Sequence, residues 1–406
     1  MATFSTSSNK KLKFALVTET YEPEINGVAM TLGKITRHLS SRAYQVQVIR
    51  PKQSAQDLAK HMENLSEFLV PGISIPFYQQ LKFGLPAQQK LIQHWKQHRP
   101  DIVHIATEGP LGWSALQAAK RLNIPTISSF HTNFHQYSGH YGLGIFAKPI
   151  QNYLRHFHNQ TLGTLAPTKK LAMELSDQGY RNVSVMTRGV DTQQFHPSKR
   201  CQTLRKQWGA NEQDTVVLYV GRLAKEKNIQ LVIDAFHQIY ATDPQAKLVF
   251  VGDGPMRDAL KKQCPQAIFV GNQQGEALAK CYASGDVFLF PSITETFGNV
   301  VPEALASGLA VVAFNYAAAA QLITHQHNGL LVDFSDDNAF IQAALELVQR
   351  SELQQHCKTQ AHKQIQHLSW ISVCNSLELQ LNQLIEHHQK HSTSPLRQSS
   401  IKRVCA

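Results

Sequence analysis

The possible folds of this chain are constrained most strongly by a repeated pattern in its sequence. Short apolar segments alternate with segments of helical spacing, and this series occurs twice in succession. In the first half, residues 12–17, 44–49 and 102–105 form apolar runs of the length expected for buried strands. The same pattern returns in the second half, for example at 215–220. Short strands that alternate with helices form parallel, doubly wound sheets. The sequence therefore predicts an α/β fold with two similar halves, divided near residue 192.

The remaining strand predictions complete the two sheets. They fall at 125–130, 163–166 and 183–186 in the first half, and at 247–251, 267–270, 286–290, 309–313 and 329–332 in the second. Residues 53–84 contain several Pro and Gly and give no clear assignment. We expect a disordered polar tail over 1–10, an N-terminal domain over 11–192, a C-terminal domain over 193–370, a helix over 371–388 that could cross back to the N-terminal domain, and a disordered tail over 389–406.

The composition is that of an ordinary globular protein whose positive charge is unevenly spread. The net charge is +11, and residues 1–165 hold 17 Lys and Arg against 8 Asp and Glu. Such a basic half can attract an anionic membrane surface or an anionic substrate. A nucleic-acid partner is not expected, because basic and aromatic residues are not interleaved in any known motif. The six Cys lack paired spacing and no apolar window is long enough to span a bilayer, so we expect a cytoplasmic protein that could bind peripherally at the inner face of the membrane.

The segment 290–308, FPSITETFGNVVPEALASG, combines a strand end, a loop and the start of a helix. Gly298 and Asn299 have the chemistry of a helix entry. Glu295 therefore lies in the loop before the helix, and Glu303 lies about one turn inside it. We expect both side chains at the carboxyl end of a parallel sheet, where open α/β sheets bind ligands. The alternative interpretation is a solvated loop with two ordinary surface acids.

Two cations follow the first strand of the second half, in the segment VGRLAKEKN at 220–228. Arg222 and Lys227, which come after Gly221, can form a phosphate clamp that neutralises an anionic leaving group without a metal. Glu303 follows a later strand of the same sheet and suits a ribose diol, because a carboxylate accepts two hydroxyls well. The alternative for the cations is a surface patch of solvated charges.

In the first half, Gly27 and His131 are the candidate ligand-binding residues. Gly27 stands at the start of a predicted helix, where a glycine lets the backbone approach a ligand closely. No GxGxxG motif accompanies it, which argues against a dinucleotide. His131 closes a strand and is expected to face the second half, although a hydrogen-bonded core histidine is the alternative. No metal site is expected, because the nearby His135 and His140 lack a carboxylate or Cys partner in a known pattern.

Taken as an ordered set, these segments resemble a known family. GRLAKEKN, VGDGP, the E-x7-E frame of Glu295 and Glu303, and NGLLV are similar to segments of the retaining GT-B glycosyltransferases of family four. In the first half, TETYEPEINGVAMTL, ATEGPLGWSAL, SSFHTNFHQYSGHYG and RGVDTQQFHP resemble a narrower branch with bacterial GDP-mannose-dependent alpha-mannosyltransferases and sulfoquinovosyl-diacylglycerol synthases. The resemblance covers about residues 12–385. It implies the GT-B fold, in which two Rossmann-like domains, one for the acceptor and one for the donor, face each other across a cleft.

The resemblance also implies roles for single residues. Arg222 and Lys227 match the pair that holds the donor diphosphate, Glu295 matches the acid near the donor sugar, and Glu303 matches the acid on the ribose. His131 matches the histidine of the first domain near the reacting sugar, which we expect to orient the sugar rather than to act as a base.

Further positions match the donor-binding loops of the family. They are Gly27 near the diphosphate, Gly221 in the clamp loop, and the loop of Phe297, Gly298, Asn299 and Val300 that meets sugar and phosphate. One position departs from the family, because Gln321 follows AAAA where many members have an acid. The role of that turn is therefore open.

The implied reaction moves a hexose of mannose or glucose type from a GDP- or UDP-linked sugar to a hydroxyl of a lipid or glycan acceptor. It retains the anomeric configuration and uses no cofactor and no metal. A nucleotide-sugar epimerase or phosphorylase on a similar fold and a non-catalytic nucleotide-sugar binding protein are the alternatives. A non-catalytic protein would be expected to lose Arg222, Lys227 or Glu295, and all three are present.

Overall fold

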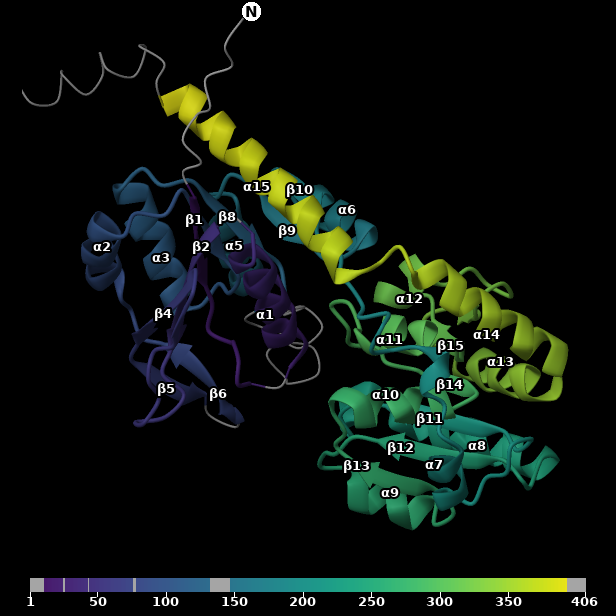
Figure 1. The fold of residues 1–406 in the computed structure, drawn as a ribbon. Helices are drawn as coiled ribbons and strands as arrows, with labels where there is room; N and C mark the ends of the chain where they lie inside the picture. Colours follow the sequence, from purple (N-terminus) through teal and green to yellow (C-terminus); the bar gives the residue numbers. More distant parts are fainter. Residues whose placement is uncertain (1–10, 25, 43, 76–77, 132–146, 393–406) are drawn as a thin grey trace, which may run out of the picture.

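The computed structural model describes residues 11–24, 26–42, 44–75, 78–131 and 147–392. Two α/β domains lie side by side, and a long C-terminal helix lies against the first of them (Figure 1). The predicted tail at 1–10 and most of the predicted C-terminal tail lie outside the described residues, as do His135 and His140.

The N-terminal domain is built on an eight-stranded sheet in the order β10-β9-β8-β7-β1-β2-β4-β3. Its neighbours pair in parallel, except for β3 and β4 at one edge. The strands are β1 (Leu12–Val17), β2 (Tyr44–Pro51), β3 (His61–Met62), β4 (Leu65–Val70), β7 (Ile102–Ile105), β8 (Thr126–Ser129), β9 (Thr164–Ala166) and β10 (Val183–Val185). Apolar cores cover both faces of the central strands, which explains their continuous apolar runs.

Five helices of this domain lie in its described part: α1 (Gly27–Ser40), α2 (Gln88–Gln97), α3 (Pro110–Arg121), α5 (Ala147–His158) and α6 (Lys169–Asp177). The start of α1 is fixed by Asn26, whose side-chain oxygen accepts the N–H groups of Val28 and Ala29 at 3.1 and 2.9 Å. Residues 53–84, which the sequence left unassigned, form β3, β4 and the antiparallel hairpin of β5 (Gly72–Ile75) and β6 (Tyr78–Gly84).

The C-terminal domain is built on a six-stranded parallel sheet in the order β13-β12-β11-β14-β15-β16. The strands are β11 (Val216–Val220), β12 (Lys247–Val251), β13 (Ile268–Gly271), β14 (Val287–Phe290), β15 (Ala310–Phe314) and β16 (Leu330–Val332). Alternate residues of β11 enter opposite cores, with Val216 and Leu218 in one and Val217 and Tyr219 in the other. Both faces of the sheet are therefore covered, as a doubly wound domain requires.

The covering helices of this sheet are α7 (Gln202–Gln207), α8 (Ile229–Thr242), α9 (Arg257–Gln263), α10 (Gly275–Ser284), α11 (Val300–Ala306), α12 (Ala317–Leu322), α13 (Asp337–Gln349) and α14 (Ser351–Ile365), with 3-10 turns η2 (Pro197–Lys199) and η3 (Lys225–Lys227). The strands predicted in both halves are confirmed, with ends that shift by one or two residues.

The last helix, α15 (Trp370–Ser392), returns to the N-terminal domain and packs against α1 (Figure 1). Leu377, Leu381 and Ile385 lie at helical spacing and are buried in the same core as β1 and β2. The hydroxyl of Tyr44 also donates to Asn382 at 2.8 Å. The helix continues past its expected end at residue 388, so the prediction of a disordered tail from residue 389 is wrong for the first residues of that tail. Polar residues can extend a helix whose apolar stripe is already anchored, because they keep its backbone hydrogen bonds.

Candidate active site

Strand order reverses within each sheet, and the predicted site residues other than His131 follow the strands at those points. In the C-terminal sheet the chain runs from β11 outward through β12 and β13, then returns to the middle with β14. Such reversals open the crevice in which α/β sheets bind ligands. Arg222 and Lys227 follow β11, while Glu295 and Glu303 follow β14. In the N-terminal sheet the reversal lies between β1 and β7, and Gly27 comes after β1.

Lys227 and Glu295 form an ion pair that crosses the reversal point. The Lys227 ammonium lies 2.5 Å from Glu295 Oε1, and the two side chains keep 18% and 15% of their surface exposed. Ser292 donates to the same carboxylate oxygen at 2.9 Å. The hydroxyl of Tyr316 donates to the Glu295 carbonyl at 2.6 Å, which fixes the backbone of the loop. The structure therefore brings together a cation and an acid that lie 68 residues apart in the sequence.

Arg222 lies on a loop whose backbone is hydrogen-bonded to the VGDGP segment at residues 251–255. Leu223 N–H donates to the Asp253 carbonyl at 2.9 Å, and the Gly221 N–H donates to the Val251 carbonyl at 3.0 Å. A Cβ on Gly252 would lie 2.0 Å from the Gly221 oxygen, so a glycine is required for this close approach. The Arg222 side chain itself is 54% exposed, with Glu226 3.7 Å away. Its guanidinium is thus placed at the sheet edge and remains accessible to a ligand.

Glu303 differs from Glu295, because it is buried. Only 9% of the residue is exposed, and its carboxylate accepts the Tyr282 hydroxyl at 2.9 Å. Burial raises the pKa of Glu303 to about 7, against the opposing effect of the Tyr282 hydrogen bond. Glu303 is therefore a carboxylate with one fixed partner and an unusually high pKa, and it lies in the first turn of α11.

The loop before α11 meets the N-terminal domain. Phe297 is buried and its carbonyl accepts the Ala318 N–H at 2.8 Å, whereas Gly298 has φ +91°, a conformation that favours glycine. Asn299 precedes Val300 at the start of α11, and its side chain makes no capping hydrogen bond. A Cβ on Gly27 would lie 3.1 Å from Asn299 Nδ2. The predicted glycine of one domain and the predicted loop of the other are therefore adjacent.

His131 lies near Gly27 and is linked to it by Arg188, a residue that the sequence analysis did not single out. His131 is 5% exposed, and its Nδ1 accepts a hydrogen bond from Arg188 at 2.9 Å. Arg188 also donates to the Gly27 carbonyl at 3.4 Å and to the hydroxyl of Thr31. Burial and the charge of Arg188 hold the pKa of His131 well below its usual range. The sequence did contain one indication of Arg188, because this residue comes shortly after the predicted strand β10. It therefore lies at the carboxyl end of the sheet, as His131 does after β8.

Gln321, where the chain departs from the family, bridges the two domains. Its side-chain nitrogen donates to the Thr187 hydroxyl at 3.3 Å, and its oxygen accepts the Lys169 N–H at 3.4 Å. An amide can donate and accept at once, which an ionised carboxylate cannot do. At this position the glutamine therefore serves contacts between the domains.

Two further features concern only the described part of the chain. Its His, Cys, Asp and Glu side chains form no group of three or more that could hold a metal ion. Of its helices, none combines the length and the apolar character needed to cross a bilayer.

Comparison with known proteins identifies the family of this chain. The family described as Glycosyltransferase Family 4 matches residues 25–194, and the family described as Glycosyl transferases group 1 matches residues 201–364. The chain is 32% identical over 371 residues to a GDP-mannose-dependent alpha-mannosyltransferase of Corynebacterium glutamicum, covering 91% of this chain and 88% of the relative. It is 27% identical over 333 residues to an alpha-monoglucosyldiacylglycerol synthase of Streptococcus pneumoniae, covering 79% and 75%.

The fold is also that of known glycosyltransferases. Sucrose-phosphate synthase from Thermosynechococcus elongatus superimposes with a TM-score of 0.78 at 18% identity, over 93% of this chain and 100% of the other. The two doubly wound domains thus form a GT-B fold. The chain is a glycosyltransferase and belongs to glycosyltransferase family 4.

Proposed function

We propose that the protein transfers a hexose of mannose or glucose type from a nucleoside-diphosphate sugar to a hydroxyl of a lipid or glycan, with retention and without metal or cofactor. The observation that carries this proposal is the Lys227–Glu295 pair at the sheet reversal, with Arg222 on the adjacent loop. This arrangement offers cations to a diphosphate and a carboxylate oxygen to a sugar hydroxyl. GDP-mannose is the first donor to test, because the Corynebacterium relative is named for it.

The clamp would act on the charge that develops as the sugar leaves. In a retaining transfer the departing diphosphate gains negative charge while the sugar becomes oxocarbenium-like. Lys227 is already held by Glu295 at 2.5 Å, so its position is set before the donor binds. Arg222 has no comparable contact and can turn toward the phosphate. Each such donor is worth about 3–4 kcal/mol of the barrier when it is well placed.

Glu303 is proposed to bind the ribose of the nucleotide. One carboxylate oxygen accepts from Tyr282, which leaves acceptor capacity for two hydroxyls of a diol. The pKa of about 7 means that ionisation near neutral pH controls this capacity. Nucleotide binding should therefore strengthen as the pH rises through that value.

We assign deprotonation of the acceptor to an oxygen of the leaving diphosphate. His131 is poorly arranged as a base, because Nδ1 is taken by Arg188 and burial disfavours its protonated form. Glu295 is engaged by Lys227 and Ser292. A phosphate oxygen on the side of the departing bond can take the proton as the new bond forms, and attack on that side retains the configuration.

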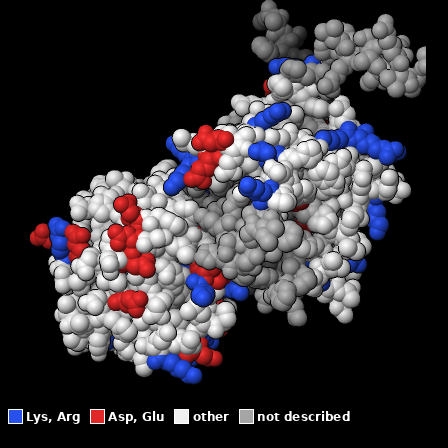
Figure 2. Space-filling view, turned by 180° about the vertical axis from the view of Figure 1, so that it is seen from behind, with Lys and Arg blue, Asp and Glu red and all other residues white. Residues whose placement is uncertain are grey.

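A lipid acceptor at a membrane surface agrees with the distribution of charge. Figure 2 shows Lys and Arg mainly over the N-terminal domain and most Asp and Glu over the C-terminal domain on that face. The basic excess of residues 1–165 would attract anionic lipids, so we propose peripheral binding at the cytoplasmic membrane face. The Streptococcus relative, an alpha-monoglucosyldiacylglycerol synthase, makes diacylglycerol lipids reasonable first acceptors to test.

The deciding experiment screens donors and acceptors. Purified protein is incubated with GDP-mannose, UDP-glucose or other nucleotide sugars and with diacylglycerol or glycan acceptors, and products are identified by mass spectrometry. Titration calorimetry then measures GDP and UDP binding to the wild type, Lys227→Ala and Glu303→Ala. Arg350→Ala is the matched control, because Arg350 forms an exposed pair with Glu346 away from these residues.

We expect one nucleotide to bind the wild type and Arg350→Ala alike and to bind both site variants at least tenfold more weakly. Absence of binding to the wild type would overturn the donor site. Conversion of one nucleotide sugar into another without transfer would favour the epimerase alternative. Loss of transfer on chelation with EDTA would contradict a metal-independent reaction.

A further inference from the structure

Arg188 is a buried cation without an anionic partner among the described residues. It is 3% exposed, and it donates hydrogen bonds to the Gly27 carbonyl, the Thr31 hydroxyl and the His131 ring, which are neutral groups. The other deeply buried arginines contrast with it. Arg50 pairs with two carboxylates at 2.6 and 2.9 Å, and Arg205 pairs with Asp286 at 2.9 Å. An unpaired buried charge is costly to the fold, so its presence beside predicted site residues calls for another explanation than stability.

The contacts of Arg188 determine which nitrogen of His131 carries the proton. A guanidinium donates hydrogen bonds and cannot accept them. Because Arg188 donates to Nδ1 of His131 at 2.9 Å, Nδ1 must be unprotonated. A neutral imidazole then carries its hydrogen on Nε2. That atom is buried and has no hydrogen-bond partner among the described residues, so the site holds one unused donor.

The groups that face His131 oppose its protonation. Burial contributes most to the low pKa, followed by the charges of Arg188, His104 and His158. The His104 ring is itself hydrogen-bonded to Ser129, and burial lowers the pKa of His104 to about 4. His131 therefore stays neutral through the neutral pH range.

Arg188 also fixes where His131 stands relative to the donor loop. Its second nitrogen donates to the Gly27 carbonyl at 3.4 Å and to the Thr31 hydroxyl, both in the first turns of α1. Gly27 in turn adjoins Asn299 of the C-terminal domain. The guanidinium thus joins the imidazole to the helix that faces the loop before α11.

We propose that Arg188 is a positioning residue, which holds His131 as the neutral Nε2–H tautomer and aims this N–H at a hydroxyl of the donor sugar. The inference rests on the proposed function for the identity of the ligand, although the tautomer itself does not depend on it. His131 acts as a fixed hydrogen-bond donor, and Arg188 acts through it without touching the substrate.

The tautomer is measured directly by NMR of protein with ¹⁵N-labelled histidine. His131→Ala identifies the resonance. In the wild type we expect Nδ1 to have the shift of an unprotonated ring nitrogen and Nε2 that of an N–H, unchanged from about pH 6 to pH 8. Arg188→Met should populate the other tautomer and let His131 titrate. Arg188→Gln keeps an amide donor to Nδ1 without the charge, so it should keep more of the wild-type tautomer than Arg188→Met. A protonated Nδ1 in the wild type would refute the proposal.

A double-mutant cycle shows whether Arg188 acts through His131. We expect Arg188→Met and His131→Ala each to lower kcat on the order of 10²-fold, and the double variant to lose no more than His131→Ala alone. GDP or UDP affinity should change by less than about threefold, because Arg222, Lys227 and Glu303, the residues proposed to hold diphosphate and ribose, lie in the other domain. If Arg188→Met lowered kcat in the His131→Ala background by the same factor as in the wild type, the positioning role would be overturned.

Two controls separate this result from misfolding and from a wrong donor assignment. Arg155→Met removes an arginine that donates to the Gln178 carbonyl at 3.1 Å, outside the proposed site, and should leave kcat unchanged. Thermal unfolding of each variant shows whether the fold persists, and the NMR readout is restricted to variants that remain folded. If no donor is turned over by the wild type, the proposed function fails, whereas the NMR result still decides the tautomer.

Discussion

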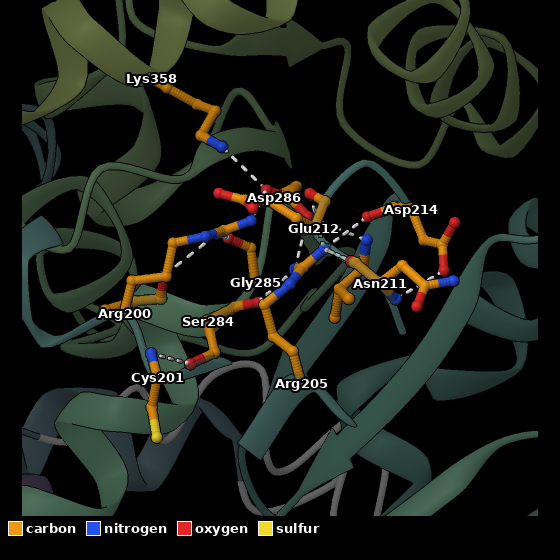
Figure 3. A network of polar contacts seen from close by, with 12 residues as sticks. Arg200, Cys201, Arg205, Asn211, Glu212, Asp214, Ser284, Gly285, Asp286 and Lys358 are labelled. Atoms are coloured by element: carbon orange, nitrogen blue, oxygen red, sulfur yellow. Dashed lines mark hydrogen bonds and ion pairs between the residues drawn. The ribbon is translucent and has the colours of Figure 1, made fainter. Parts of the chain in front are cut away.

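The two ends of strand β14 carry acids with opposite properties. At the amino end, Asp286 accepts from Arg200, Arg205 and Lys358 at 3.0, 2.9 and 2.8 Å (Figure 3). Arg205 also donates to the backbone carbonyls of Ser284 and of the loop before β11. Burial alone would raise the pKa of Asp286, but Lys358 and the two arginines outweigh it and lower the pKa. This acid is saturated with partners.

At the carboxyl end the charged groups differ from Asp286 in exposure or in pKa. Glu295 and Lys227 pair, but both stay partly exposed, and Arg222 is more than half exposed. Glu303 has one hydroxyl partner and a raised pKa. Charged groups at the two ends of β14 therefore have two different proposed roles in one domain, stabilisation of the fold and binding of a ligand. The saturated Asp286 holds helices and strands together, whereas an exposed cation such as Arg222 and an acid with a raised pKa such as Glu303 are accessible in charge or protonation to a ligand.

The largest effect on stability is expected for Asp286→Ala. It leaves three cations without their shared anion, so the free energy of unfolding should fall by about 3–5 kcal/mol. Urea unfolding measures it, and Glu346→Ala, which breaks an exposed pair with Arg350, serves as control. The rate of transfer per folded molecule should stay unchanged. If fully folded Asp286→Ala lost most of its transfer activity, the amino end of β14 would not have a purely structural role.

Arg222→Ala should show the reverse pattern. The value of kcat/KM should fall by about 10²–10³-fold, because one cation no longer stabilises the leaving diphosphate. The free energy of unfolding should stay within about 0.5 kcal/mol of the wild type, since the side chain is exposed and its contact with Glu226 is long. Steady-state kinetics and urea unfolding on the same preparation test both statements. Unaltered kinetics would remove Arg222 from the clamp.

The sequence predicted the parts of this contrast that are encoded locally. The strands of both sheets were predictable, because each is a continuous apolar run bounded by turn residues. The sequence also predicted that four charged residues lie at one edge of the sheet, because they follow such runs and the carboxyl ends of parallel strands share one edge. These residues are Arg222, Lys227, Glu295 and Glu303. The hairpin of β5 and β6 was missed, since its short strands are not continuous apolar runs.

Partners that folding brings together from distant segments could not be read from the sequence. Tyr282 reaches Glu303 across 21 residues, and Arg188 reaches His131 across 57. No local spacing indicates these contacts, because the packing of helices and loops on the sheets sets them. The burial of Glu303 was unpredictable for the same reason, and it changes the expected chemistry through the pKa.

Glu303→Gln tests that pKa with an intermediate effect. The pKa of the buried acid is raised to about 7, so the folded state keeps a proton that the unfolded state releases from about pH 4.5 upward. The contribution of Glu303 to stability is therefore complete at low pH and is lost as the pH rises through 7. Glutamine has no such loss. At about pH 8 the variant should gain about 1–3 kcal/mol relative to the wild type, and at about pH 5 the gain should be much smaller.

Urea unfolding of both proteins across this pH range gives the difference curve. Although Glu303→Gln should gain stability, it should bind the nucleotide more weakly than the wild type, because an amide accepts ribose hydroxyls less well than a carboxylate. A flat difference curve would show that Glu303 titrates normally, which would remove the contrast with Asp286.

Lys358→Met gives the smallest effect and tests how far the amino end is saturated. Lys358 is 19% exposed, and Arg200 and Arg205 remain on Asp286 when it is removed, so unfolding should become easier by only about 1 kcal/mol. The lowered pKa of Asp286 means that its stabilisation is present above the unfolded-state pKa and is lost as the pH falls through the folded-state value. Without Lys358 that pKa rises, so the acid limb of the stability curve should shift to higher pH. A loss as large as that of Asp286→Ala would instead show that Lys358 is indispensable and that the two arginines alone do not neutralise the acid.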